Sequence, residues 1–151
     1  MTALETDLLA ELIQRKHACL TQLLAMGQKQ LHTVLEGSMT DLLDLLAAKQ
    51  RVLADLQRVQ RALAPFAEQD PEQRQWRSLE RRQQCAEQLR QCEVLLREIV
   101  AQERESERQL VSRRDKTAAQ LQGVHAASEA RGAYACRAQA STRHLDLTSE
   151  R

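Results

Sequence analysis

Apolar residues recur every three or four positions along most of the chain, which is the spacing that places them on one face of an α-helix. Two such stretches are present, residues 4–64 and residues 71–128, and neither has an internal proline. Each stretch can bury its apolar face by packing against the other. The pattern therefore predicts an all-α fold, an elongated antiparallel helical hairpin or coiled coil with these two stretches as its arms.

The first arm contains an interruption at Gly37-Ser38. Glycine is common just after the last residue of a helix, and a serine followed three residues later by an acidic residue, here Asp41, is a typical helix start. The apolar stripe also shifts by one heptad position near this point. We predict a kink or a one-residue interruption, which divides the arm into Leu4–Glu36 and Met39 to about Leu63. The alternative is one continuous helix that tolerates an unfavourable interior glycine.

The break between the arms has its own sequence signals. Pro65 disfavours helix at the residue before it, so the first arm is expected to end there. Asp70, Pro71 and Gln73 have the spacing of a helix cap, a first helical residue and a residue that bonds back to the cap, so the second arm is expected to begin at Pro71. Phe66 and Trp76 lie near this turn, and we expect them to plug the end of the hairpin; an exposed docking point is the alternative.

A hairpin turn centred near residue 67 sets an approximate register between the arms. Glu103, a polar residue within the apolar stripe of the second arm, is then expected opposite His32 and near Lys29, where a buried charge pair would fix the register more than it adds stability. Gly27 lies on the apolar stripe of the first arm. We expect it to mark a close approach of another helix.

Composition and charge argue against several classes of function. The 151 residues are 42% hydrophobic but only 2% aromatic, and 22 Lys and Arg balance 21 Asp and Glu. A thin helix pair fits this composition, whereas nucleic-acid binding calls for net positive charge and stacking aromatic residues. The chain also lacks a glycine-rich phosphate loop, a nucleophile elbow and a histidine pair at metal-ligand spacing. We therefore expect neither catalytic residues nor a metal or cofactor.

Four cysteines, at positions 19, 85, 92 and 136, have no spacing typical of a disulfide framework. We interpret them as small, mostly buried side chains of a reducing compartment. No apolar run approaches the ~18 residues that a membrane span requires, and the N-terminus lacks the pattern of a signal peptide. A cytoplasmic protein without membrane insertion is the expectation.

After Ser128 the helical periodicity disappears and small residues dominate. We predict a helical domain over residues 1–128 and a mobile tail over residues 129–151. Tyr134 and the pair Leu145 and Leu147 are the apolar points in this tail that could contact a partner.

Several local features resemble the FlgN family of flagellar type III export chaperones. They are Leu35-Glu36-Gly37-Ser38 leading into Leu42-Leu43, then Lys49-Gln50-Arg51-Val52-Leu53, a long helix rich in Arg, Gln and Glu, and a small-residue tail with one tyrosine. The resemblance extends over nearly the whole chain.

The resemblance implies a cytoplasmic chaperone that binds C-terminal helical segments of the hook–filament junction proteins FlgK and FlgL and delivers them to the export gate protein FlhA. The family binds its clients through its C-terminal third. The client-binding residues expected here are apolar side chains of that third: Leu110, Val111, Leu121, Val124, Leu145 and Leu147.

Many members dock at the gate through the tyrosine of a Tyr-Gly-Pro tail. Tyr134 matches this tyrosine and is the expected docking residue, although Ala135 and Cys136 stand where glycine and proline would be. The alternative function is a structural coiled-coil stalk or adaptor of a secretion or cytoskeletal assembly, which would self-associate.

Overall fold

The protein consists almost entirely of α-helix. The computed structural model describes the backbone of residues 2–148 and the side chains of residues 2–140. It contains α1 (Ala3–Glu36), α2 (Met39–Ala67), a single 3-10 turn η1 (Pro71–Gln73) and α3 (Leu79–Thr148), with no strand in the described backbone. Contacts divide the chain into two units, Met1–Leu110, here called the bundle unit, and Val111–Arg151, here called the C-terminal unit. The predicted all-α class is confirmed.

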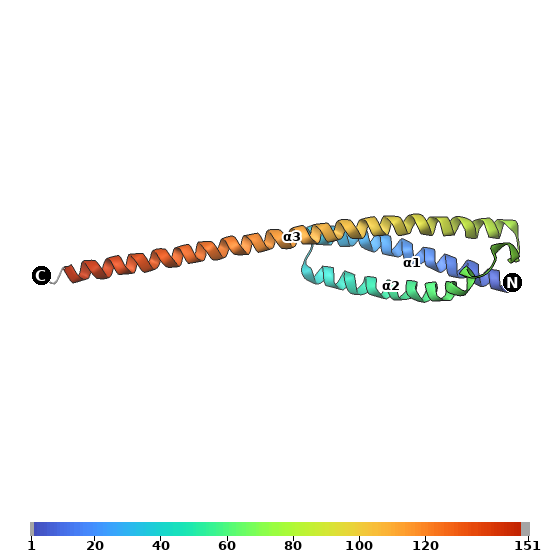
Figure 1. The fold of residues 1–151 in the computed structure, drawn as a ribbon, viewed down its shortest axis with the longest axis horizontal. Helices are drawn as coiled ribbons and strands as arrows, with labels where there is room; N and C mark the ends of the chain where they lie inside the picture. Colours follow the sequence, from blue (N-terminus) through green and yellow to red (C-terminus); the bar gives the residue numbers. More distant parts are fainter. Residues whose placement is uncertain (1, 149–151) are drawn as a thin grey trace. The chain divides into compact units, whose positions relative to one another are not determined.

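The predicted interruption at Gly37-Ser38 is confirmed, but the chain reverses there instead of bending. The Gly37 N–H donates to the Thr33 carbonyl (2.8 Å), and the Ser38 hydroxyl accepts from the Asp41 N–H (3.1 Å), so one helix ends and the next begins at once. Both Gly37 and Ser38 have extended backbone, which turns α2 back along α1 as an antiparallel neighbour (Figure 1). A Cβ at Gly37 would lie 2.9 Å from the Thr33 carbonyl oxygen, which explains the glycine.

Two clusters of buried side chains join the three helices within the bundle unit, and each cluster has members from α1, α2 and α3. The first contains Leu9, Leu12, Ile13, Phe66 and Cys85, and the second contains Leu20, Leu23, Val52, Cys92 and Ile99. From the first cluster to the second, residue numbers rise in α1 and α3 and fall in α2. In the bundle unit α3 is therefore parallel to α1 and antiparallel to α2.

The end of α2 and the start of α3 differ from the sequence prediction. Pro65 lies within the last turn of α2, which continues to Ala67 and places Phe66 in the first buried cluster. Pro71 begins only the short turn η1, with Asp70 capping it through the Glu72 N–H (3.0 Å). The long helix begins at Leu79, where the Ser78 hydroxyl accepts from the Arg81 N–H (3.1 Å).

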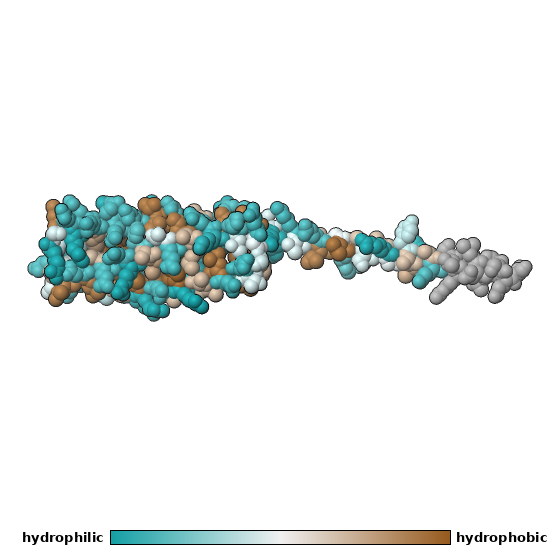
Figure 2. Space-filling view, turned by 180° about the vertical axis from the view of Figure 1, so that it is seen from behind, coloured by the Kyte–Doolittle hydropathy of each residue, from teal (hydrophilic) through white to brown (hydrophobic). Residues whose placement is uncertain are grey.

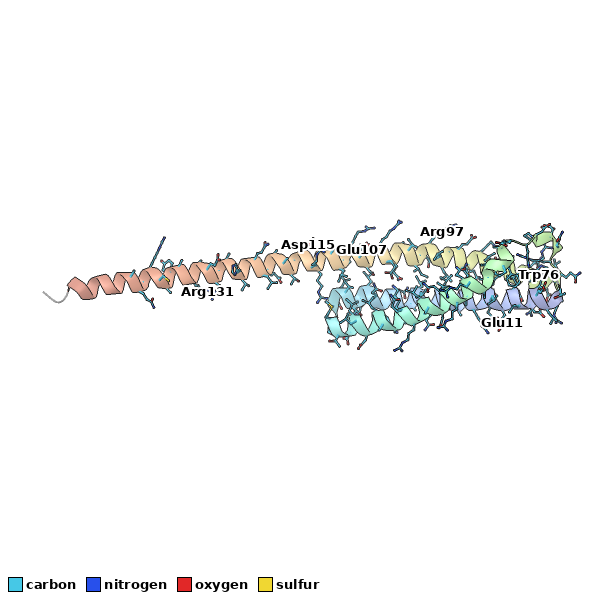
Figure 3. The ribbon with its side chains drawn as sticks, turned by 60° about the horizontal axis from the view of Figure 1, so that its bottom comes forward. Glu11, Trp76, Arg97, Glu107, Asp115 and Arg131 are labelled. Atoms are coloured by element: carbon cyan, nitrogen blue, oxygen red, sulfur yellow. The ribbon has the colours of Figure 1, made fainter. Side chains whose placement is uncertain are left out.

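Tertiary contacts keep the segment before α3 out of the helical conformation. The Thr6 hydroxyl donates to the Gln75 carbonyl (2.6 Å), and an Arg74 guanidinium nitrogen donates to the Phe66 carbonyl (2.8 Å). Trp76, seen at the end of the bundle in Figure 3, packs against the first buried cluster. The expected plug of Phe66 and Trp76 is thus confirmed, and forming it requires the non-helical segment between Gln73 and Leu79.

The C-terminal unit consists of the continuation of α3. Helix extends to Thr148, so residues 129–148, for which we predicted a mobile tail, have helical backbone; their mobility stays a prediction. The division between units lies at Leu110 and Val111, whereas the sequence prediction put the domain boundary after residue 128. Within the described residues, no helix combines the length and the apolar character that crossing a membrane requires.

Candidate functional site

A polar layer links the three helices of the bundle unit. Lys49 of α2 is 7% exposed, and its ammonium group donates to the Gln30 side-chain oxygen of α1 (2.9 Å) and forms an ion pair with Glu103 of α3. Burial lowers the pKa of Lys49 below its ordinary value. A buried charge held by one partner from each neighbouring helix specifies their register, because a shift of any helix leaves the ammonium unpaired.

This layer corrects the predicted partner of Glu103. Sequence reasoning placed Glu103 opposite His32 and Lys29, but the reversal at Gly37 brings α2 against α3, and Lys49 takes that place. His32 instead lies 3.7 Å from Glu36 of its own helix, on the exposed surface. The sequence does mark Lys49 as a buried polar residue, because it lies seven residues after Leu42 and seven before Leu56, at a heptad position that is otherwise apolar.

Gly27 marks the predicted close approach of another helix. A Cβ at this position would overlap the side chain of Gln102 on α3. When the Gln102 amide is oriented so that both its nitrogen and its oxygen form hydrogen bonds, the nitrogen donates to the Leu24 carbonyl (3.3 Å) and the oxygen accepts from the Gln28 N–H (3.1 Å). The missing side chain of Gly27 thus makes room for an amide that bonds to the backbone of α1.

A groove of about 450 Å³ lies beside the polar layer, within the bundle unit. Its lining includes Val34 of α1, Leu42 and Leu46 of α2, and Val100 and Leu110 of α3. Ser106 also lines it; its side chain is 3% exposed, and its hydroxyl has no hydrogen-bond partner. The groove therefore has mostly apolar walls and one buried hydroxyl without a hydrogen-bond partner.

The buried cysteines of the bundle are held as thiols. Burial raises the pKa of the Cys92 thiol above its ordinary value of 9.0, with Lys16 acting in the opposite direction, and burial also raises the pKa of Cys85. Reactive cysteines require the opposite shift, because the thiolate is the nucleophile. These two side chains are therefore packing residues of the two buried clusters.

The raised thiol pKa values predict an alkaline loss of stability. A group whose pKa is higher in the folded state contributes stability that is present below its unfolded-state pKa and is lost as the pH rises through the folded-state pKa. We expect the free energy of unfolding to fall with pH above about 9, and to fall less steeply in Cys92→Ala, by up to about 1.4 kcal/mol per pH unit.

Urea unfolding at several pH values between about 8 and 10.5, with a reductant present, measures how steeply the free energy of unfolding changes with pH in the wild type and in Cys92→Ala. Lys49, whose pKa is lowered, acts in the opposite direction, but it is present in both proteins and cancels in the comparison. Equal slopes for the wild type and Cys92→Ala would contradict the assignment of the alkaline effect to this thiol.

Most of the predicted client-binding side chains are exposed on α3. Leu110 is 43% exposed at the end of the bundle unit. In the C-terminal unit, Val111 is 40%, Leu121 66% and Val124 67% exposed. Figure 2 shows apolar atoms at the surface along this helix. Leu145 and Leu147 lie in helical backbone, and their side chains fall outside the described residues.

Helix geometry separates these side chains into faces. With about 100° between successive residues, Leu121 and Val124 lie about 60° apart and share one face, whereas Val111 lies about 80° from Leu121. Tyr134, which is 79% exposed, lies about 140° from Leu121. Leu121 and Val124 therefore form one apolar surface, here called the α3 stripe, and Tyr134 projects from a different side of the helix.

No cluster of three or more His, Cys, Asp or Glu side chains in the described part of the chain could hold a metal ion. Comparisons of the chain with models of known protein families, with curated proteins and with solved structures found no match.

Proposed function

We propose that this protein is an export chaperone that holds an amphipathic helical segment of a secreted flagellar junction protein, of the FlgK or FlgL type, on the α3 stripe. The observation that carries the proposal is the exposure of Leu121 and Val124, two large apolar side chains three residues apart on a helix. All side chains of residues 113–140 are exposed in the structure, so this helix presents its full circumference to a partner.

The chemistry of helix recognition supports this role. Apolar side chains at positions i and i+3 are the anchors with which one amphipathic helix packs against another. Leu121 and Val124 supply such a pair. A client segment that becomes helical only on binding loses conformational entropy as it does so, which limits affinity and permits release at the export machinery.

The proposed chaperone docks at the export gate protein FlhA and works in the cytoplasm. Tyr134 is the docking residue for FlhA, and its position on another side of the helix from the α3 stripe leaves it accessible while a client is bound. The described chain contains four free cysteines, which fits a reducing compartment such as the cytoplasm. We also propose that the protein binds other proteins and does not catalyse a reaction; Cys85 and Cys92, whose thiol pKa values are raised by burial, serve as packing residues.

A binding experiment with a C-terminal fragment of FlgK tests the client assignment. We expect the full chain to bind the fragment, and a chain truncated after residue 117 to lose binding while keeping the helical circular dichroism expected of the bundle unit. The substitution Leu121→Asp in the full chain is expected to weaken binding about tenfold or more, because it places a charge in an apolar contact.

Tyr134→Ala is the matched control, since it removes an exposed side chain on another side of the same helix. It is expected to bind the FlgK fragment normally and to weaken binding to FlhA. Full binding of the FlgK fragment by the truncated chain would refute the site.

A coiled-coil stalk or adaptor is the second candidate function. It is favoured by exposed apolar side chains on α3 within the bundle unit, where Leu89, Leu96 and Val100 are each between 42% and 46% exposed. Such a protein would assemble through these residues and would bind neither FlgK nor FlhA. The same binding experiment therefore distinguishes the two candidates.

A further inference from the structure

α3 carries two pairs of exposed residues, and each pair consists of one apolar and one charged side chain seven residues apart. The charged residue is acidic in one pair and basic in the other. In the bundle unit, Val100 is 42% exposed, and Glu107, labelled in Figure 3, is an exposed carboxylate seven residues later. In the C-terminal unit, Arg114 is exposed, and Leu121 follows it by seven residues. Residues seven apart lie within about 20° of each other around a helix. Each unit therefore presents one apolar and one charged side chain on a single line.

The two units also differ in net charge. Residues 1–110 contain 15 Lys and Arg and 17 Asp and Glu, whereas residues 111–151 contain 7 and 4. Arg114 makes a loose contact of 3.4 Å with its sequence neighbour Asp115, and both side chains are largely exposed. An exposed ion pair contributes little free energy, so Arg114 loses little when it leaves Asp115 and pairs with another carboxylate.

We propose that two copies of this chain form a dimer through antiparallel α3 helices. Arg114 of one copy pairs with Glu107 of the second copy, and Leu121 of the first packs against Val100 of the second. The equal spacing of seven residues allows both contacts to form at once in antiparallel orientation. The contact joins the C-terminal unit of one copy to the bundle unit of the other, and since both copies carry both units, the same contact can form in each direction.

Charge selects this orientation over a parallel one. Parallel pairing in register would place Glu107 against Glu107 and Arg114 against Arg114, and like charges at facing positions of paired helices are destabilising. The antiparallel arrangement replaces both repulsions with attractions. Its apolar contacts also cover side chains that the single chain leaves in water.

The need for a partner follows from helix physics. An isolated helix in water gains little stability from hydrogen bonding alone, and most helical stability in proteins comes from packing an apolar face. Residues 113–140 are helical with all side chains exposed. A second copy supplies the missing packing along Leu121, and at the same time it covers Val100.

The dimer does not depend on the proposed client. Leu121 belongs both to the dimer contact and to the α3 stripe, so a bound client and the second copy would exclude each other. The tests below use the full chain without client, and they can fail whether or not FlgK binds.

The first test measures the mass of the full chain in solution. Light scattering after gel filtration is expected to give twice the chain mass of 17.2 kDa at high concentration, with dissociation on dilution. Val100→Glu is expected to raise the dissociation constant about tenfold or more, because it puts a carboxylate into the apolar contact.

Val94→Glu is the matched control: Val94 is 51% exposed on the same helix but lies about 120° from Val100. It is expected to leave the dimer unchanged. A monomer at every concentration, or equal dissociation constants for the two variants, overturns the proposal.

The second test exchanges the charges. Glu107→Arg and Arg114→Glu are each expected to weaken the dimer, and the chain carrying both substitutions is expected to recover it, because the pairs are restored with reversed sign. The weakening by either single substitution is expected to shrink in high salt. A double variant that dimerises no better than the single variants means that these two residues do not face each other, and it refutes the register. Helical circular dichroism of every variant confirms that the chain is folded.

Discussion

Leu20→Ala is expected to lower the free energy of unfolding by about 3 kcal/mol, within the 2 to 5 kcal/mol typical of large-to-small changes at buried leucines. Leu20 is 1% exposed in α1 and belongs to the second buried cluster, with Val52 of α2 and Cys92 of α3. Truncation removes the transfer free energy of the lost methyl groups and leaves a cavity between three helices, which cannot close without moving one of them. Urea unfolding followed by circular dichroism measures the change.

Leu4→Ala is the matched control, because Leu4 is on the same helix and is 73% exposed. We expect it to change the free energy of unfolding by less than about 0.5 kcal/mol. If the two substitutions were equally mild, Leu20 would not lie in a packed interface of three helices, and the bundle described above would be incorrect.

The second large effect concerns the polar layer. Glu103→Ala is expected to lower the free energy of unfolding by about 2 kcal/mol, because it leaves the Lys49 ammonium buried with Gln30 as its remaining partner in the layer. Removing one member of a fully buried ion pair costs roughly 3 to 5 kcal/mol. We expect less here because the Glu103 side chain is 42% exposed, so water can reach the site.

A double-mutant cycle separates this explanation from a loss of packing. In a Lys49→Met background the buried charge is absent, and Glu103→Ala is then expected to cost less than about 0.5 kcal/mol. Lys49→Met alone is expected to cost less than Glu103→Ala, because the carboxylate that it leaves unpaired is 42% exposed and can be hydrated, while the Gln30 oxygen loses its donor. An unchanged cost of Glu103→Ala in that background would show that the two side chains do not interact.

The sequence allowed prediction of the helices and of the break at Gly37-Ser38, because apolar periodicity and capping residues are local signals. It did not predict the reversal at this break. A cap determines where a helix ends, but the direction of the next helix depends on which apolar faces pack together. Once α2 folds back, α3 becomes parallel to α1, and the expected partner of Glu103 changes from His32 to Lys49.

The start of α3 was missed for a similar reason. Asp70 and Pro71 form a correct helix start, but only one turn follows it, because Trp76 packs into the first buried cluster and the Gln75 carbonyl accepts from Thr6. These partners are distant in sequence. The hairpin prediction also buried the apolar face of the second arm as far as residue 128, and it was wrong for Leu121 and Val124, which are exposed. A stripe that packs within the chain and one that faces water have the same periodicity, so the sequence could not distinguish them.

The reversal at Gly37-Ser38 also sets an order of events while the chain is being made. The contact between α1 and α2 joins neighbouring segments, so it can form as soon as residue 67 has left the ribosome, and contacts that are close in sequence form rapidly. At about 5–20 residues per second, the ribosome needs roughly 2 to 9 s more to supply the rest of the bundle unit. During that interval the nascent pair of helices lacks its third member, and the faces of Leu20 and Val52 that Cys92 will cover are open to chaperones of the host cell.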